Sequence, residues 1–129
     1  MIIAVDFDGT ICEHRFPEIG APVADAITWM RRWQSAGIQL VLWTVRGGEA
    51  LQLAVDYCQQ NGVIFDGINA NVTNIFLKEF SNKIYADLYV DDRAVGCPLC
   101  KNPGSQAVVV DWNDVGPKIL EWHRKLGHG

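Results

Sequence analysis

MIIAVDFDGT, residues 1–10, joins a continuous apolar run to two aspartates that are separated by one residue and followed by glycine. A run without polar alternation fits a strand that is covered on both faces, and Gly9 favours an end to that strand after Asp8. In an open α/β sheet, ligands bind outside the carboxyl ends of the strands, so Asp6 and Asp8 are expected to face a site. Two close carboxylates repel each other unless a cation neutralises them, and Mg²⁺, which prefers oxygen ligands, is the natural candidate. The alternative is a strand-end turn in which the aspartates only cap backbone donors.

Strand-like and helix-like segments alternate along the rest of the chain, as they do in α/β domains with a parallel sheet. Apolar residues at helical spacing, together with glycine and proline signals, predict helices over residues 23–36, 49–60 and 115–126. Short apolar runs predict further strands over residues 38–43, 63–65, 86–90 and 107–110. Residues 66–82 mix turn-forming and apolar residues without a clear period, and we assign no element to them. The predicted fold class is therefore α/β, with a parallel sheet and helices packed on it.

The composition is that of a globular protein with one domain, residues 1–129, since 49% of the residues are hydrophobic and 20% are charged. A net charge of -4 and a pI near 5.2 give no overall attraction to nucleic acid or to an anionic membrane. Any anionic substrate must then be held by local groups. The beginning of the sequence lacks the pattern of a signal peptide, and no apolar run is long enough to span a bilayer, so a cytoplasmic location is expected.

The cysteines are Cys12, Cys58, Cys97 and Cys100. A chain with ample apolar residues and no export signal does not need a disulfide framework, so we expect reduced thiols. Cys97 and Cys100 have the spacing of a redox motif, but they follow a strand in a loop and do not open an obvious helix. A redox or zinc role for this pair is therefore the lesser alternative.

Several predicted strands end in polar residues. The first leads to Asp6 and Asp8, the second to Thr44, and a later one to Asp91-Asp92. Because the carboxyl ends of parallel strands meet at one edge of a sheet, these side chains converge if the strands are neighbours.

Two residues close to these strand ends have less specific expectations. Arg46 precedes two glycines, and its planar guanidinium could contact a substrate phosphate or carboxylate, although most arginines simply face water. His14 follows the first aspartates at the expected entrance, but it has no partner in the sequence that suggests a metal cluster or a triad. We predict no special role for His14.

The chain resembles the haloacid dehalogenase-like hydrolases, and specifically their small phosphatase-like members without a large cap domain. The resemblance rests on the signature at residues 6–10, Thr44 at the second motif, Lys83 at the third and Asp91-Asp92 at the fourth, and it covers residues 1 to about 95. It implies a three-layer Rossmann-like domain with a central parallel sheet flanked by helices. It also implies that the strand bearing Asp6 lies between those that end at Thr44 and Asp91.

The resemblance implies roles for the acidic residues. Asp6 is the expected nucleophile, which attacks a phosphoryl group and forms an aspartyl-phosphate that water then cleaves. Asp8 is the expected general acid for the departing alcohol and general base for the hydrolytic water, while its backbone carbonyl binds the metal. Mg²⁺ is the expected cofactor, held by Asp6, Asp8, Asp91 and Asp92, with Asp92 acting directly or through a water.

Thr44 and Lys83 are expected to bind the phosphoryl group. Thr44 would donate its hydroxyl to the phosphoryl oxygens, and Lys83 would supply a fixed positive charge beside Asp6. Lys78 is the rival for that role, but Lys83 stands at the family-like offset before Asp91. A threonine at a strand end and a lysine in a loop also occur without such roles.

The expected function is a magnesium-dependent phosphomonoester hydrolase, a phosphatase that acts on a small phosphorylated substrate. One alternative is a receiver-like phosphoacceptor signalling domain, which also gathers acids, a hydroxyl residue and a lysine around magnesium. Receivers place the phosphorylated aspartate at a later strand end, whereas here the spaced aspartates come first. The other alternative is a non-catalytic domain that binds phosphate or a sugar phosphate. Without a large cap the site is expected to be open, and a homodimer would be one way to cover it.

Overall fold

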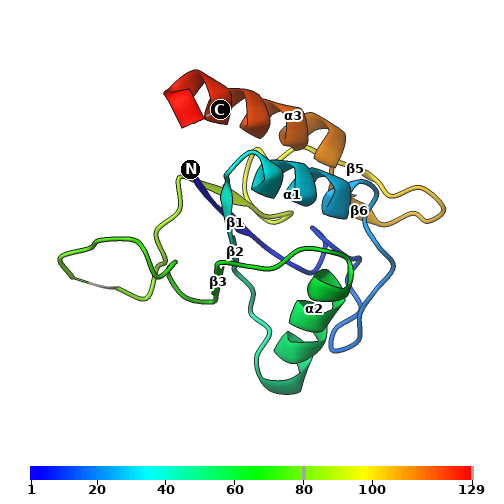
Figure 1. Ribbon diagram of the computed structural model, residues 1–129. Helices are drawn as coiled ribbons and strands as arrows, with labels where there is room; N and C mark the ends of the chain where they lie inside the picture. The colour runs from blue at the N-terminus through cyan, green and yellow to red at the C-terminus, as the bar shows by residue number, and fades with distance from the viewer. Residues whose placement is uncertain (80, 129) are drawn as a thin grey trace.

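Parallel strands in the order β3-β2-β1-β4 form the central sheet (Figure 1). The structure is a computed structural model that describes residues 1–79 and 81–128. The strands are β1 (Ile2–Val5), β2 (Gln39–Leu42), β3 (Gly67–Ile68) and β4 (Leu88–Val90). β1 pairs with β2 on one side and with β4 on the other, so Val5 lies level with both Leu42 and Val90. The predicted parallel α/β class is confirmed, and the strand that leads to Asp6 has its predicted neighbours.

The helices cover one face of this sheet. They are α1 (Ala26–Ser35), α2 (Gly48–Gln60) and α3 (Trp112–His123), and a π-helical turn, Arg124–His128, follows α3. The β1–α1–β2 and β2–α2–β3 connections step in the same direction across the sheet, so right-handed crossovers place α1 and α2 on the same side. Buried side chains of the helices join those of β1 and β2 in the main core, among them Ile3, Val5, Leu40 and Leu42.

The three predicted helices are confirmed, and the last of them begins earlier than expected, at Trp112. Between β1 and β2 the chain forms only a loop and α1, which confirms the expected lack of a large cap domain. No described helix is both long enough and apolar enough to cross a membrane.

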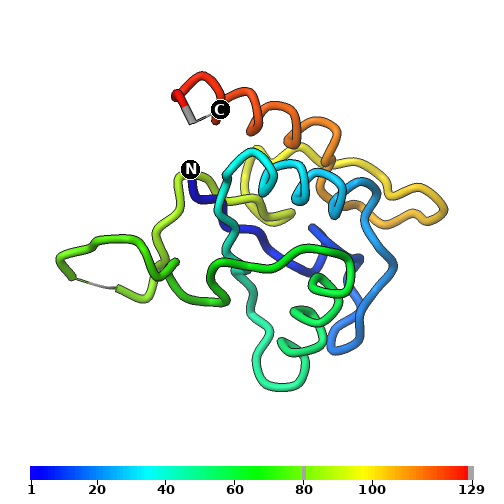
Figure 2. Tube along the Cα trace, in the orientation of Figure 1, coloured from blue at the N-terminus to red at the C-terminus, as the bar shows by residue number. Residues whose placement is uncertain are grey.

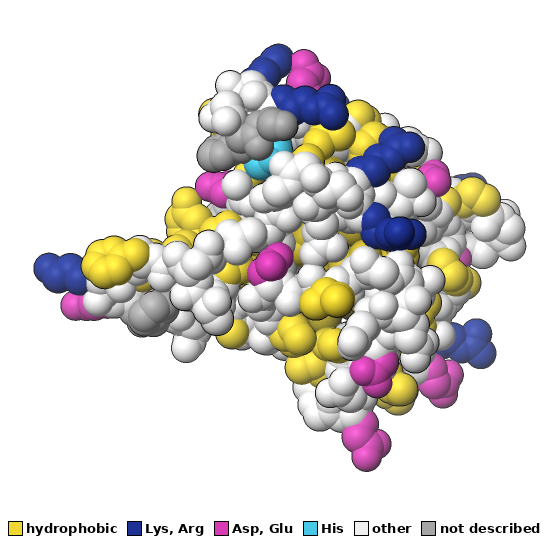
Figure 3. Space-filling model, in the orientation of Figure 1, with side chains coloured by type: hydrophobic (Ala, Val, Ile, Leu, Met, Phe, Trp, Pro, Cys, Tyr) yellow, Lys and Arg dark blue, Asp and Glu magenta, His cyan; other side chains and the backbone are white. Residues whose placement is uncertain are grey.

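The opposite face of the sheet is covered by irregular chain. Ala4 and Val41 on this face pack against Val72 and Ile84, which come from the segment between β3 and β4. Of the unassigned residues 66–82, residues 67 and 68 form β3 and residues 69–82 belong to this segment, in which residue 80 lies outside the described part of the chain. Its middle projects from the body of the molecule (Figures 1 and 2), and it carries exposed apolar and charged side chains (Figure 3). The three layers are thus helices, sheet and a non-helical layer.

Two predicted strands need correction. The strand over residues 63–65 is wrong: Val63 is buried, but its N–H donates to the Cys58 carbonyl, so this apolar residue closes α2 and does not pair in the sheet. The strand predicted over residues 107–110 exists as β6 (Val108–Val110), but it pairs with β5 (Leu99–Lys101) in a separate antiparallel hairpin. Only a short turn joins β5 to β6, which is too short for a parallel crossover.

Tryptophan side chains link α1 and α3 to the loop after β1. The Trp33 and Trp112 rings lie 5.2 Å apart, and the Trp33 indole donates to the Gly116 carbonyl at 3.0 Å. Gly116 lets the Trp29 ring pack directly on the backbone of α3, where a Cβ would overlap it. The Trp112 indole donates to the Thr10 carbonyl at 2.7 Å. The helical layer therefore fixes Thr10 at the carboxyl end of β1.

Candidate active site

Three of the predicted site residues meet where β1 and β4 end. Asp6 follows β1 directly, and Asp91 and Asp92 follow β4. One carboxylate oxygen from each of these residues lies within 4.8 Å of the other two, and all three residues are partly buried. Asp6, Asp91 and Asp92 are called the acidic cluster below.

Thr10 and His14 hold the acidic cluster in place. The Thr10 hydroxyl donates to Asp6 Oδ2 at 3.1 Å and accepts the backbone N–H of Asp92 at 3.2 Å. His14 Nε2 lies 2.9 Å from Asp92 Oδ2. The sequence predicted no partner for His14, but the loop after β1 folds back and brings the ring onto an acid that follows a distant strand. The position of His14 shortly after the first motif was the only signal for it.

Gly9 lets these side chains lie close to the backbone. Its φ of 84° is in the left-handed region, which glycine adopts readily. A Cβ at this position would overlap Asp92 Oδ2 and crowd His14 Nε2. The glycine of the first motif is therefore required both by the turn and by the side chains packed over it.

The acidic cluster is electrostatically unfavourable by itself. Burial, followed by the negative charges of Asp91 and Asp92, raises the pKa of Asp6 from its ordinary value of 3.8 to about 8. Asp92 Oδ1 is buried and has no hydrogen-bond partner among the described residues. Because buried polar atoms are nearly always paired, this oxygen beside two other carboxylates indicates a place for a ligand. An all-oxygen donor set of this kind fits a hard divalent cation such as Mg²⁺.

Asp8 and Arg46 bind each other outside the acidic cluster. Arg46 Nε and Nη2 donate to the two carboxylate oxygens of Asp8, each at 2.8 Å. The remaining N–H groups of Arg46 donate to backbone carbonyls, and the residue is only 1% exposed. Every N–H donor of the guanidinium is thus bound within the protein, which leaves none for the predicted contact of Arg46 with a substrate. The carbonyl of Asp8, which the sequence predicted as a metal ligand, accepts no backbone N–H from a described residue.

Thr44 lies just beyond β2, beside the strand that carries Asp6. Its N–H donates to Asn69 Oδ1 at 2.9 Å, and its hydroxyl oxygen accepts the N–H of Arg46 at 3.2 Å. These contacts fix the residue at the strand end. The Thr44 O–H has no acceptor among the described residues, so it can serve as a donor to a ligand.

Lys83 and Lys78 are not brought to the acidic cluster. Both are exposed on the segment before β4, and neither forms an ion pair with any described residue. Lys83 Nζ lies instead 5.2 Å from the centre of the Tyr89 ring. The offset of Lys83 from Asp91 in the sequence does not determine its position, because the segment between them folds against the far face of the sheet.

A solved structure resembles this chain over nearly its whole length. It is described as the structure of the conserved protein coded by a locus from Bacteroides thetaiotaomicron, and it is 38% identical to this chain. The match has a TM-score of 0.78 and covers 94% of this chain and 90% of that one. The chain belongs to the family of that conserved protein. Membership of this conserved-protein family supports the α/β fold of the chain. The description of the solved structure names no activity. No protein-family model matches the chain, and a search of curated proteins gave no match.

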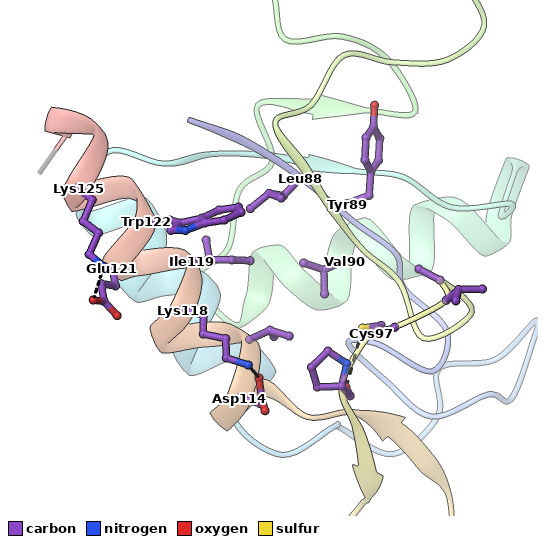
Figure 4. Close-up of a pocket in the computed structure, with 15 residues that line it drawn as sticks. Leu88, Tyr89, Val90, Cys97, Asp114, Lys118, Ile119, Glu121, Trp122 and Lys125 are labelled. Carbon is purple, nitrogen blue, oxygen red and sulfur yellow. Dashed lines mark hydrogen bonds and ion pairs between the residues drawn. The ribbon is translucent and has the colours of Figure 1, made fainter.

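The structure also has an apolar pocket that does not include the acidic cluster. Its volume is about 590 Å³, and it runs between β4 and α3, where it is lined by Leu88, Val90, Ile119 and Trp122 (Figure 4). At its rim Lys118 pairs with Asp114, and Lys125 pairs with Glu121 (Figure 4). None of the acids of the acidic cluster lines this pocket, so it is not part of the candidate active site.

The raised pKa of Asp6 predicts how the stability of the metal-free protein depends on pH. With a folded-state pKa of about 8 against an ordinary 3.8, the folded protein holds a proton that the unfolded chain has lost. The corresponding stability is fully present below pH 3.8 and is lost as the pH rises through 8. Without divalent cations, the thermal midpoint should therefore fall between pH 5 and pH 8, less steeply for Asp6→Asn than for the wild type.

Thermal unfolding followed by circular dichroism in a metal chelator checks this prediction. Glu49→Gln, at an exposed acid at the start of α2, is the matched control and should follow the wild type. Adding Mg²⁺ at pH 7.5 should raise the midpoint of the wild type and of Glu49→Gln more than that of Asp6→Asn. Identical pH curves for Asp6→Asn and the wild type would contradict the described environment of Asp6.

Proposed function

We propose that the protein is a magnesium-dependent phosphomonoester hydrolase that works through an aspartyl-phosphate on Asp6. The observation that carries the proposal is the buried, unpartnered Oδ1 of Asp92 beside Asp6 and Asp91, at the carboxyl ends of neighbouring parallel strands. This edge is where α/β sheets bind ligands. The resemblance of residues 6–10, Thr44 and Asp91-Asp92 to the haloacid dehalogenase-like motifs selects phosphoryl transfer among the reactions that such a site could support.

Asp6 is the nucleophile in this proposal. One of its carboxylate oxygens forms a bond to phosphorus while the bond between phosphorus and the leaving oxygen breaks. Thr10 holds Asp6 Oδ2 and so helps to fix the orientation of the carboxylate. A magnesium ion bound by the acidic cluster would neutralise these carboxylates and the charge on the transferred phosphoryl group.

Asp8 and Thr44 complete the reaction. Asp8 gives a proton to the leaving alcohol oxygen, and as a carboxylate it then takes a proton from the water that attacks the phosphorylated Asp6. The free O–H of Thr44 supplies a neutral donor to a phosphoryl oxygen.

The proposed substrate is a small phosphorylated metabolite. The lack of a large cap domain supports an open site. We also propose a cytoplasmic location, which is supported by the unpaired state of all four cysteines.

Phosphate release from a panel of phosphorylated metabolites, with Mg²⁺ or with a chelator, tests the proposed function. We expect many turnovers for at least one compound and loss of activity in the chelator. One stable phosphoryl group per protein molecule, formed from acetyl phosphate, would instead support the receiver-like alternative. Binding of a phosphorylated compound without any release would support the non-catalytic alternative.

A further inference from the structure

Arg46 is the most completely bound charged side chain of the site. A guanidinium has five N–H donors, and each of those of Arg46 has a protein acceptor. Two donors meet the Asp8 carboxylate, and the others meet the carbonyls of Pro17 at 2.8 Å, Glu18 at 2.7 Å and Ala50 at 3.0 Å. One side chain thus joins two parts of the chain between β1 and α1, at Asp8 and at Pro17 and Glu18, to the first turn of α2.

Two aromatic rings lie close to this guanidinium. Its carbon lies 4.9 Å from the centre of the Phe7 ring and 5.3 Å from that of the Phe16 ring. Phe7 is fully buried, whereas Phe16 is 62% exposed and belongs to the same loop as Pro17 and Glu18. Phe16 is therefore the exposed ring that covers the Arg46 guanidinium.

These contacts couple the loop to Asp8. Arg46 holds the two Asp8 oxygens in a bidentate pair, which fixes the plane of the carboxyl group as well as its position. The same guanidinium holds the loop through Pro17, Glu18 and Phe16. A shift of the loop must therefore alter the orientation of Asp8.

We propose that Arg46 is a positioning residue for Asp8, and that the loop with Phe16 keeps Arg46 in place. This inference rests on the proposed phosphatase function. In the pair with Arg46, Asp8 is a carboxylate, so it first takes up a proton from solvent. It then passes this proton to the leaving oxygen as the bond between that oxygen and phosphorus breaks, and a misaligned Asp8 slows this transfer. The slower proton transfer lowers the rate when the leaving group is a poor one, such as an alkoxide. It has little effect on the rate when the leaving group is nitrophenolate, which leaves without a proton.

The test compares kcat/KM for glycerol phosphate and for p-nitrophenyl phosphate. Arg46→Lys keeps the charge but cannot form the bidentate pair, and Phe16→Ala removes only the exposed cover. For both variants we expect a loss of about tenfold or more with glycerol phosphate and a clearly smaller loss with p-nitrophenyl phosphate. Asp8→Asn should show the same selectivity, and adding Arg46→Lys to it should cause no further loss. Phe76→Ala, at a phenylalanine that is 92% exposed on the projecting segment, is the matched control and should leave both values unchanged.

Thermal unfolding shows which variants are folded. If Arg46→Lys is not folded, the kcat/KM values of Phe16→Ala alone test the positioning role. Equal losses for the two substrates, or no loss for either, in a folded variant would overturn the positioning role while the phosphatase function stands. A wild type that releases phosphate from neither these esters nor the metabolite panel would overturn the phosphatase function and this inference with it.

Discussion

Asp6→Asn is expected to abolish repeated magnesium-dependent phosphate release while the protein stays folded. An amide oxygen is a poor nucleophile toward phosphorus, so the first step should slow by at least about a thousandfold, as when other covalent nucleophiles are removed. The fold should survive because the replacement has the same shape and is neutral at every pH, in a cluster where burial raises the pKa of Asp6 to about 8. The Thr10 hydroxyl can still donate to the amide oxygen.

Steady-state phosphate release and thermal unfolding of the same preparation check this result. Asp114→Asn, which alters a partly buried acid paired with Lys118 on α3, away from the acidic cluster, is the control and should keep the wild-type rate. Acid-quenched wild type should retain labelled phosphate on the chain during turnover, and Asp6→Asn should not. Wild-type activity in Asp6→Asn would show that another group attacks the phosphorus.

Arg46→Leu is expected to lower the free energy of unfolding by about 3–5 kcal/mol, the usual cost of breaking a buried ion pair from one side. Asp8 is 8% exposed, and its carboxylate would lose its bidentate partner without gaining access to water. The carbonyls of Pro17, Glu18 and Ala50 would lose their donors as well. The variant should therefore be much less stable than one that lacks a surface arginine.

Denaturant titration measures this difference. Arg32→Leu is the control, since Arg32 is exposed and its carbon lies 4.7 Å from the centre of the Trp29 ring, and it should cost less than about 1 kcal/mol. Replacing Asp8 by Leu in the Arg46→Leu background should restore part of the stability, because no unpaired charge then remains buried. A cost for Arg46→Leu no larger than that for Arg32→Leu would mean that the pair contributes little to the fold.

The acidic cluster could be located from the sequence because its geometry follows from local rules. Asp6 and Asp91 each come directly after an apolar run, and parallel strands bring their carboxyl ends to one edge. The order of β2, β1 and β4 came from the motif resemblance, and the structure has that order. No long-range side-chain contact had to be known for this part.

The sequence did not reveal the contacts between side chains that are distant in the sequence and are brought together by the conformation of loops. Arg46 reaches Asp8 only because the chain after β2 turns back under the loop that holds Pro17, and the pattern around Arg46 is compatible with an exposed residue. His14 reaches Asp92 through the fold of the same loop. Lys83 lies away from the cluster because the hydrophobic residue that follows it, Ile84, packs on the far face of the sheet.

The hydrogen bond from the Trp112 indole to the Thr10 carbonyl has a consequence for fragments of this protein. A shortened chain that stops at Asp111 would retain every motif residue. It would still lack the indole hydrogen bond that fixes Thr10 between Asp6 and Asp92. The smallest competent piece of this architecture must therefore include the final helix, although that helix contributes no reactive group of its own.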